Sequence, residues 1–183
     1  MDDVKHACEE RMKKTLAALK DDFAGIRTGR ASPALLDKLR VDYYGQKSPI
    51  SQVANVSVPE ARLIVVQPWD KALIGEIEKA IQKSELGLNP SNDGKVIRIS
   101  IPPLTEQRRK ELVKGAKATA ETSRVAIRNI RRDGIEDLKK HHDSGMPEDA
   151  IKKMEEELQK LTDSYVGQVN KVLEEKEKEI MEV

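Results

Sequence analysis

Metal-binding and aromatic residues are scarce in this 183-residue sequence. Its single cysteine, Cys8, can form neither an internal disulfide nor a four-cysteine zinc site, and it fits a reducing compartment. Three histidines in the whole chain do not suggest a dedicated transition-metal site. Aromatic residues amount to 3% of the sequence, too few for the series of stacking platforms that single-stranded nucleic acids occupy. We therefore expect no bound metal and no cofactor.

Long apolar segments are also missing. No stretch approaches the roughly 20 apolar residues that a membrane-spanning helix needs. The first residues do not combine a basic segment with an apolar one, as a signal peptide does. The sequence therefore predicts a cytoplasmic protein without membrane contact.

Enzyme motifs are absent as well. The sequence has no phosphate-binding glycine loop, no zinc-protease helix and no serine nucleophile flanked by glycines. Cys8 falls on the apolar face of a predicted helix, where a buried, unreactive thiol is a simpler interpretation than a nucleophile. A hydrolase would need a clustered acid–base pair, which the pattern does not contain. We therefore expect a binding protein rather than an enzyme.

What the sequence does contain is charge, at 36%, and apolar residues at helical spacing. Apolar positions recur every three or four residues over 4–26, which predicts an amphipathic helix. A second helix is predicted over 105–142, about 57 Å long at 1.5 Å per residue, and a third begins at Pro147 and runs nearly to the end. Each has one apolar stripe, so the three pack most economically as an antiparallel bundle.

Between the first two helices the periodicity changes to that of β-strands. Apolar residues alternate or form short runs, and residues 70–84 return to helical spacing. We expect Trp69, just before this helix, in the core of the module, with a surface position facing a partner as the alternative. The four expected strands are 39–43, 53–58, 63–66 and 96–101.

Together these patterns predict an α+β fold: an elongated three-helix antiparallel bundle with an inserted small β/α/β domain, forming an L-shaped two-domain protein. The bundle is expected to comprise 1–30 and 105–183, and the inserted domain 31–104. Because the chain crosses between the domains twice, the two linkers form a hinge that would bend at few points. The expected hinge residues are Gly29, Ser32, Pro33, Pro102, Pro103 and Leu104.

The net charge is only +1, but the charges are unevenly distributed. Residues 104–134 hold nine basic and four acidic side chains, whereas 135–183 hold eight basic and fourteen acidic ones. Most basic residues of the first segment share one helix face. This basic stripe comprises Lys110, Lys114, Lys117, Arg124, Arg128 and Arg131, with Arg109 and Arg132 beside it.

Two interpretations of the basic stripe are open. Pattern alone favours a solvated helix face, or one that pairs with the acidic third helix. The alternative is a phosphate-binding surface, which the dense arginines of residues 128–132 support because guanidinium groups bind phosphate in bidentate geometry. The expected target in that case is the backbone of folded RNA or DNA, recognised by its shape.

Five motifs, in order and spacing, resemble the ribosome recycling factor family. They are RTGRASP at 27–33, YYG at 43–45, GLNP at 87–90, PPLTEQRRK at 102–110 and RNIRRD at 128–133. The resemblance covers essentially the whole chain. Gln107 stands where the family commonly has an acid, and Gly134 stands where alanine is usual. A glycine there would soften the second helix.

The resemblance implies a non-enzymatic translation factor. After stop-codon release such a factor binds the large ribosomal subunit through its rRNA. With elongation factor G and GTP it splits the post-termination complex and releases mRNA and tRNA. The GTP belongs to elongation factor G, and the chain is expected to be a monomer. The implied RNA-binding residues are Arg131, the strongest candidate, with Arg132, Arg128, Arg109, Arg27 and Arg30. A helical protein-binding adaptor or chaperone is the alternative function.

Overall fold

The computed structural model describes residues 2–182, which fall into two compact units. One unit contains the chain up to Ile26 together with Glu106–Glu182, and the other contains Arg27–Thr105. Residues 27–30, which the sequence patterns assign to the bundle, group with the second unit in this division.

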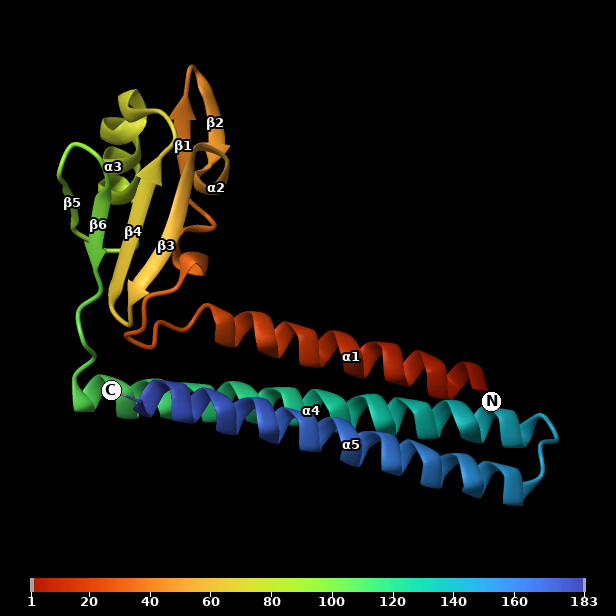
Figure 1. Ribbon diagram of the computed structural model, residues 1–183. Helices are drawn as coiled ribbons and strands as arrows, with labels where there is room; N and C mark the ends of the chain where they lie inside the picture. Colours follow the sequence, from red (N-terminus) through yellow and green to blue (C-terminus); the bar gives the residue numbers. More distant parts are fainter. Residues whose placement is uncertain (1, 183) are drawn as a thin grey trace. The chain divides into compact units, whose positions relative to one another are not determined.

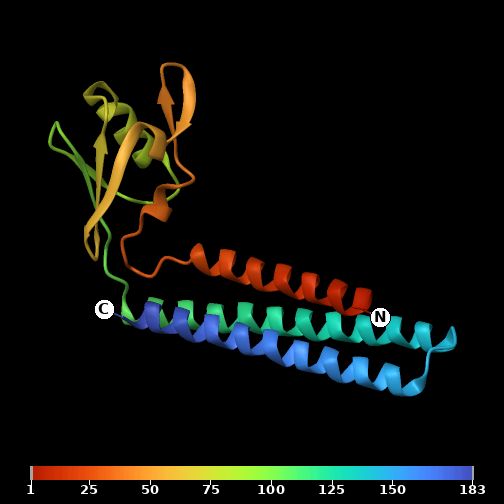
Figure 2. The same cartoon turned by 45° about the vertical axis from the view of Figure 1, so that its right-hand side comes forward.

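The first unit is a bundle of three helices. They are α1 (Asp2–Ala24), α4 (Glu106–Asp143) and α5 (Glu148–Met181). Both views show α4 and α5 side by side along their length, with α1 packed against them and antiparallel to α4 (Figures 1 and 2). Each helix buries one stripe of side chains in a shared core. On α1 the buried residues are Cys8, Met12, Leu16, Leu19 and Phe23. The predicted three-helix bundle is confirmed.

The connection between α4 and α5 is tight because glycine ends α4. Gly145 has a φ of +99°, a conformation that favours glycine. The amides of Gly145 and Met146 donate to the carbonyls of His142 and His141, which caps the helix in a Schellman arrangement. The sequence suggested Pro147 as the first residue of α5. In the structure Pro147 is the N-cap residue, and the helix begins at Glu148.

The second unit contains two small sheets. A four-stranded antiparallel sheet has the order β3-β4-β6-β5, and β1 and β2 form a separate hairpin. The strands are β1 (Arg40–Tyr43), β2 (Gln46–Pro49), β3 (Ala54–Glu60), β4 (Leu63–Pro68), β5 (Pro90–Asn92) and β6 (Ile97–Ser100). The helical segments are η1 (Pro33–Leu36), α2 (Ile50–Val53), η2 (Lys71–Leu73) and α3 (Ile74–Lys83).

The structure adds two strands that the sequence patterns did not predict. β2 and β5 are short, polar and contain proline, so neither shows the apolar alternation of a strand. β2 forms by pairing with β1, and β5 by pairing with β6. The other four strands lie where the alternation predicted them. The module's apolar side chains form their own core, separate from that of the bundle.

Trp69 was expected in this core, but the residue is 68% exposed. The reason is the alternation of β4, in which Ile64, Val66 and Pro68 are buried. The next residue therefore points to the opposite side. The Trp69 amide donates to the Val53 carbonyl at 3.1 Å, which holds the backbone while the indole faces solvent. The expectation of a core tryptophan was wrong.

None of the helices within residues 2–182 combines the length and apolar character needed to cross a membrane.

Candidate nucleic-acid interface

The basic stripe runs along α4, and its members differ in exposure. Lys110, Lys114, Lys117 and Arg128 are exposed, whereas Arg124 and Arg131 are half-buried. This difference follows from the third helix, because α5 supplies hydrogen-bond partners to the two half-buried arginines. The stripe is therefore partly solvated and partly tied into the bundle.

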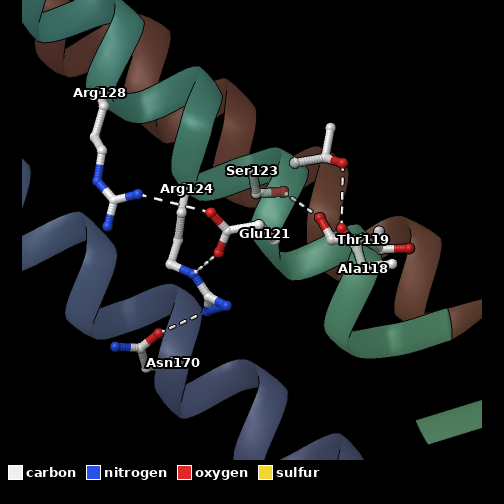
Figure 3. A network of polar contacts seen from close by, with 8 residues as sticks. Ala118, Thr119, Glu121, Ser123, Arg124, Arg128 and Asn170 are labelled. Atoms are coloured by element: carbon white, nitrogen blue, oxygen red, sulfur yellow. Dashed lines mark hydrogen bonds and ion pairs between the residues drawn. The ribbon is translucent and has the colours of Figure 1, made fainter. Parts of the chain in front are cut away.

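Arg124 belongs to the tied part. Its Nε donates to Glu121 at 2.9 Å and its Nη1 donates to Asn170 of α5 at 2.9 Å (Figure 3). Glu121 also lies 3.7 Å from Nη1 of Arg128. With a side chain only 17% exposed, Arg124 links α4 to α5. It is poorly placed to bind a phosphate.

Arg131 is held from one side. Its Nη1 donates to Oε1 of Gln159 on α5, and Nε2 of Gln159 donates to Asp163 at 2.8 Å. Within residues 2–182, the buried Nε of Arg131 has no hydrogen-bond partner. The guanidinium is thus fixed in place without a direct carboxylate contact.

Arg132 is the most available cation beside Arg131. It is exposed and forms no ion pair or hydrogen bond within the described part of the chain. The carboxylate of the following residue, Asp133, forms an ion pair with Arg11 of α1 at 2.8 Å. Arg128, Arg131 and Arg132 therefore form a compact basic group on little more than one turn of α4.

The other three candidate RNA ligands are one residue at the start of α4 and two residues of the second unit. Arg109 is at the start of α4, about 33 Å away along the helix at 1.5 Å per residue, and its buried Nε has no partner among the described residues. Arg27 and Arg30 belong to the second unit, where Nη1 of Arg27 donates to the Leu86 carbonyl. The structure brings three of the six candidates together.

The expected hinge residues have clear local roles in the second unit. Gly29 has a φ of +77°, and a Cβ on it would lie 3.3 Å from Cγ of Leu104, so the outgoing and returning linkers pack closely here. Ser32 caps η1 by accepting a hydrogen bond from the Ala34 amide, and Pro33 begins that helix. Pro102 and Pro103 are exposed on the return path. Their part in bending stays a prediction.

A cluster of exposed aromatic rings was missed by the sequence patterns. Tyr43 and Tyr44 meet edge to face with centroids 4.8 Å apart, and the Tyr44 hydroxyl donates to Asp70 at 3.2 Å. Tyr44 is 76% exposed, and Trp69 precedes Asp70 in the chain. Three of the five aromatic residues of the protein are thus exposed on the second unit, and the Tyr44–Asp70 hydrogen bond links the tyrosine pair to the residue next to Trp69. The signal that could have indicated the exposure of Trp69 is its position directly after Pro68, the last buried residue of an alternating strand.

Comparison with known proteins gives the chain its family. The family model described as ribosome recycling factor matches residues 19–181. The chain belongs to the ribosome recycling factor family. A ribosome-recycling factor of Treponema denticola is 60% identical over 183 residues, covering 100% of this chain and 99% of that protein. One of Caldicellulosiruptor bescii is 58% identical, with 96% of both chains covered.

Solved structures of ribosome recycling factors agree with this assignment. A solution structure of a ribosome recycling factor matches with a TM-score of 0.81 at 47% identity, covering 100% of this chain and 97% of that chain. A second match, with a TM-score of 0.65, 47% identity and coverage of 99% and 98%, comes from models of the T. thermophilus ribosome recycling factor and the E. coli elongation factor G bound to the E. coli post-termination complex. The fold expected from the resemblance is thereby confirmed.

Proposed function

We propose that this chain recycles ribosomes after termination in the cytoplasm. It binds the large subunit through rRNA and, together with elongation factor G and GTP, splits the post-termination complex and releases mRNA and tRNA. The observation that carries the RNA contact is the basic group of Arg128, Arg131 and Arg132 on one face of α4. The family assignment and the structural relative on a post-termination complex support the rest.

Phosphate binding by this group needs no base recognition. Arginines bind phosphate oxygens through paired N–H donors, which supplies affinity and register on a folded RNA. Arg124 already donates hydrogen bonds to Glu121 and Asn170, so the phosphate contact is expected at the end of the stripe nearest Arg131. Arg109, Arg27 and Arg30 add peripheral contacts.

The chain acts by binding and movement, and GTP hydrolysis is the task of elongation factor G. The bundle of 1–30 and 105–183 is the anchored part, and the inserted domain of 31–104 moves on the two linkers. Gly29 and Leu104 mark the place where these linkers touch. The chain works as a monomer and without a cofactor of its own.

The aromatic cluster of Tyr43, Tyr44 and Trp69 is the protein-facing surface of the inserted domain in this proposal. Large aromatic side chains dominate protein interfaces because they bury much area with few rotatable bonds. Elongation factor G is the partner proposed for this surface.

A salt titration of Arg131→Ala tests the RNA contact. Binding of the unmodified chain to purified large subunits should fall linearly and steeply with the logarithm of salt concentration. Arg131→Ala should weaken binding by about 1.5–3 kcal/mol, the range for hydrogen bonds to charged groups, with an almost unchanged melting temperature. Salt-insensitive binding would favour the helical adaptor or chaperone instead. Unchanged affinity of Arg131→Ala would contradict the assignment of that residue.

A further inference from the structure

The helix that faces Arg131 is acidic, yet the side chain it offers to Arg131 is neutral. Within Glu148–Met181 there are ten carboxylates and six basic side chains. The guanidinium nevertheless donates to the amide oxygen of Gln159 and makes no direct contact with a carboxylate among the described residues. A neutral partner on so acidic a helix requires a reason beyond general charge balance.

Other basic residues that cross between the bundle helices meet carboxylates. Lys5 pairs with Glu157 at 2.8 Å, Arg11 with Asp133 at 2.8 Å, and Lys117 lies 3.9 Å from Glu177. Arg124 also has Glu121 in addition to its amide partner Asn170. Arg131 differs from all of these because, within residues 2–182, its hydrogen-bond partner is uncharged.

The amide of Gln159 is itself oriented. Its Nε2 donates to Oδ1 of Asp163, one turn further along α5, at 2.8 Å. Because Nε2 is committed to Asp163, the oxygen of the same amide must face Arg131. The negative charge of Asp163 thus fixes the amide and remains one hydrogen bond removed from the guanidinium.

We propose that Gln159, held by Asp163, is a positioning residue that fixes the Arg131 guanidinium for phosphate while leaving its positive charge uncompensated. This inference rests on the proposed binding of RNA through Arg131. A carboxylate at the same place would form a charge-assisted pair with Arg131 and compete with the phosphate. The amide oxygen restrains the side chain by a hydrogen bond but leaves the full charge available.

The test compares Gln159→Glu with a matched control, Gln168→Glu. Gln168 is exposed on the same helix, so both variants add one negative charge to α5. Gln159→Glu should bind purified large subunits roughly tenfold more weakly than Gln168→Glu, with a salt slope shallower by about 0.7–0.9, the value for one phosphate contact. Its melting temperature should stay close to that of Gln168→Glu, because the new ion pair with Arg131 offsets the lost hydrogen bond to Asp163 and the repulsion between the two carboxylates.

A loss of affinity without a matching loss of stability distinguishes positioning from simple packing. If Gln159 only supported the bundle, affinity would follow the melting temperature in both Gln159→Glu and Gln159→Ala, and the proposal would be overturned. Equal affinity of Gln159→Glu and Gln168→Glu would overturn it as well. Arg131→Ala, measured in parallel, separates the two levels: a normal affinity there refutes the RNA contact itself, whereas a weakened one leaves Gln159 as the only point at issue.

Discussion

Gly134 shows at the scale of one residue how a missing side-chain atom permits close packing of three helices. A Cβ at this position of α4 would lie 2.6 Å from Sγ of Cys8 on α1 and 3.1 Å from Cδ1 of Leu158 on α5. The first distance is far below van der Waals contact. The glycine thus has a steric reason, in addition to the softening of the helix expected from its propensity. The Cys8 thiol that fills this space is buried, which raises its pKa and suits an unreactive packing role.

Gly134→Ala should therefore destabilise the bundle, even though alanine is the better helix former by about 1 kcal/mol. Overpacking of this kind costs about 1–3 kcal/mol, so a net loss of up to about 2 kcal/mol in the free energy of unfolding is expected. In a Cys8→Ala background the loss should shrink, because the atom that clashes is gone. Urea unfolding followed by circular dichroism measures all four combinations. Equal losses in both backgrounds would refute the steric explanation.

At the scale of elements, the β1–β2 turn presents an aromatic side chain where small residues are usual. Tyr43 pairs with Gln46, so Tyr44 and Gly45 form a two-residue turn with φ values of +47° and +84°. Turns of this type prefer Asn-Gly, because bulky side chains are strained at positive φ. A strained, exposed tyrosine beside Asp70 is consistent with selection for contact rather than for stability.

Tyr44→Asn should consequently separate stability from function. The variant should be as stable as the parent or more so, by up to about 1 kcal/mol, since asparagine tolerates positive φ. Binding to large subunits should be unchanged, whereas splitting driven by elongation factor G should fall severalfold. Light scattering of post-termination complexes measures the splitting. Trp69→Ala should show the same loss of splitting as Tyr44→Asn. Normal splitting by both variants would exclude the aromatic cluster as the partner surface.

The turn between β5 and β6 gives the inserted domain a defined response to acid. The Asp93 carboxylate accepts hydrogen bonds from the amides of Val96 and Lys95 at 2.9 Å and from Arg98 at 2.5 Å. The Val96 and Lys95 amides, followed by Arg98, lower the pKa of Asp93 far below its usual range. The ionised carboxylate therefore stabilises the turn above the unfolded pKa of about 3.9.

As the pH falls below about 4, Asp93 becomes protonated in the unfolded chain but stays ionised in the folded protein. The contribution of Asp93 to stability is therefore lost progressively. Asp93→Asn should remove that part of the acid dependence and lower stability at neutral pH. Amide hydrogen exchange of β6 between pH 3 and 7, corrected for the intrinsic rate, measures it. An identical pH profile in the two proteins would show that Asp93 does not control the turn.

At the scale of the whole molecule, the proposed mechanism needs the inserted domain to move on its two linkers. A bundle held on RNA by the Arg131 group can transmit force only if the other domain moves as a unit. Glycine at 29 and prolines at 33, 102 and 103 leave few positions at which these linkers can bend.

A reversible disulfide between the two domains tests this mechanism, with Cys8 first replaced by serine to prevent mispairing. The oxidised protein should bind large subunits normally but fail to split them with elongation factor G, and reduction should restore splitting. The Cys8→Ser parent, with recycling activity close to normal, is the control. Full activity of the verified oxidised protein would refute the moving hinge and leave the RNA contact untouched.

The helices, most of the strands and the family could be predicted from the residues alone. Amphipathic periodicity is local, so the stripes of α1, α4 and α5 identify both the helices and the faces they bury. The same periodicity located the basic face of α4. Alternation along β4 likewise indicates an outward position for Trp69, although the residue type suggested a buried one.

The partner of each side chain, in contrast, depends on how distant segments of the chain pack together. Arg124 and Arg131 have equivalent positions in the sequence pattern. In the structure Arg124 donates to Glu121 and Asn170, whereas Arg131 donates to Gln159. β2 and β5 exist because neighbouring strands complete their hydrogen bonds, which no local pattern encodes. A sequence specifies which face a side chain lies on, but its availability depends on partners distant in the chain, and those are set by packing.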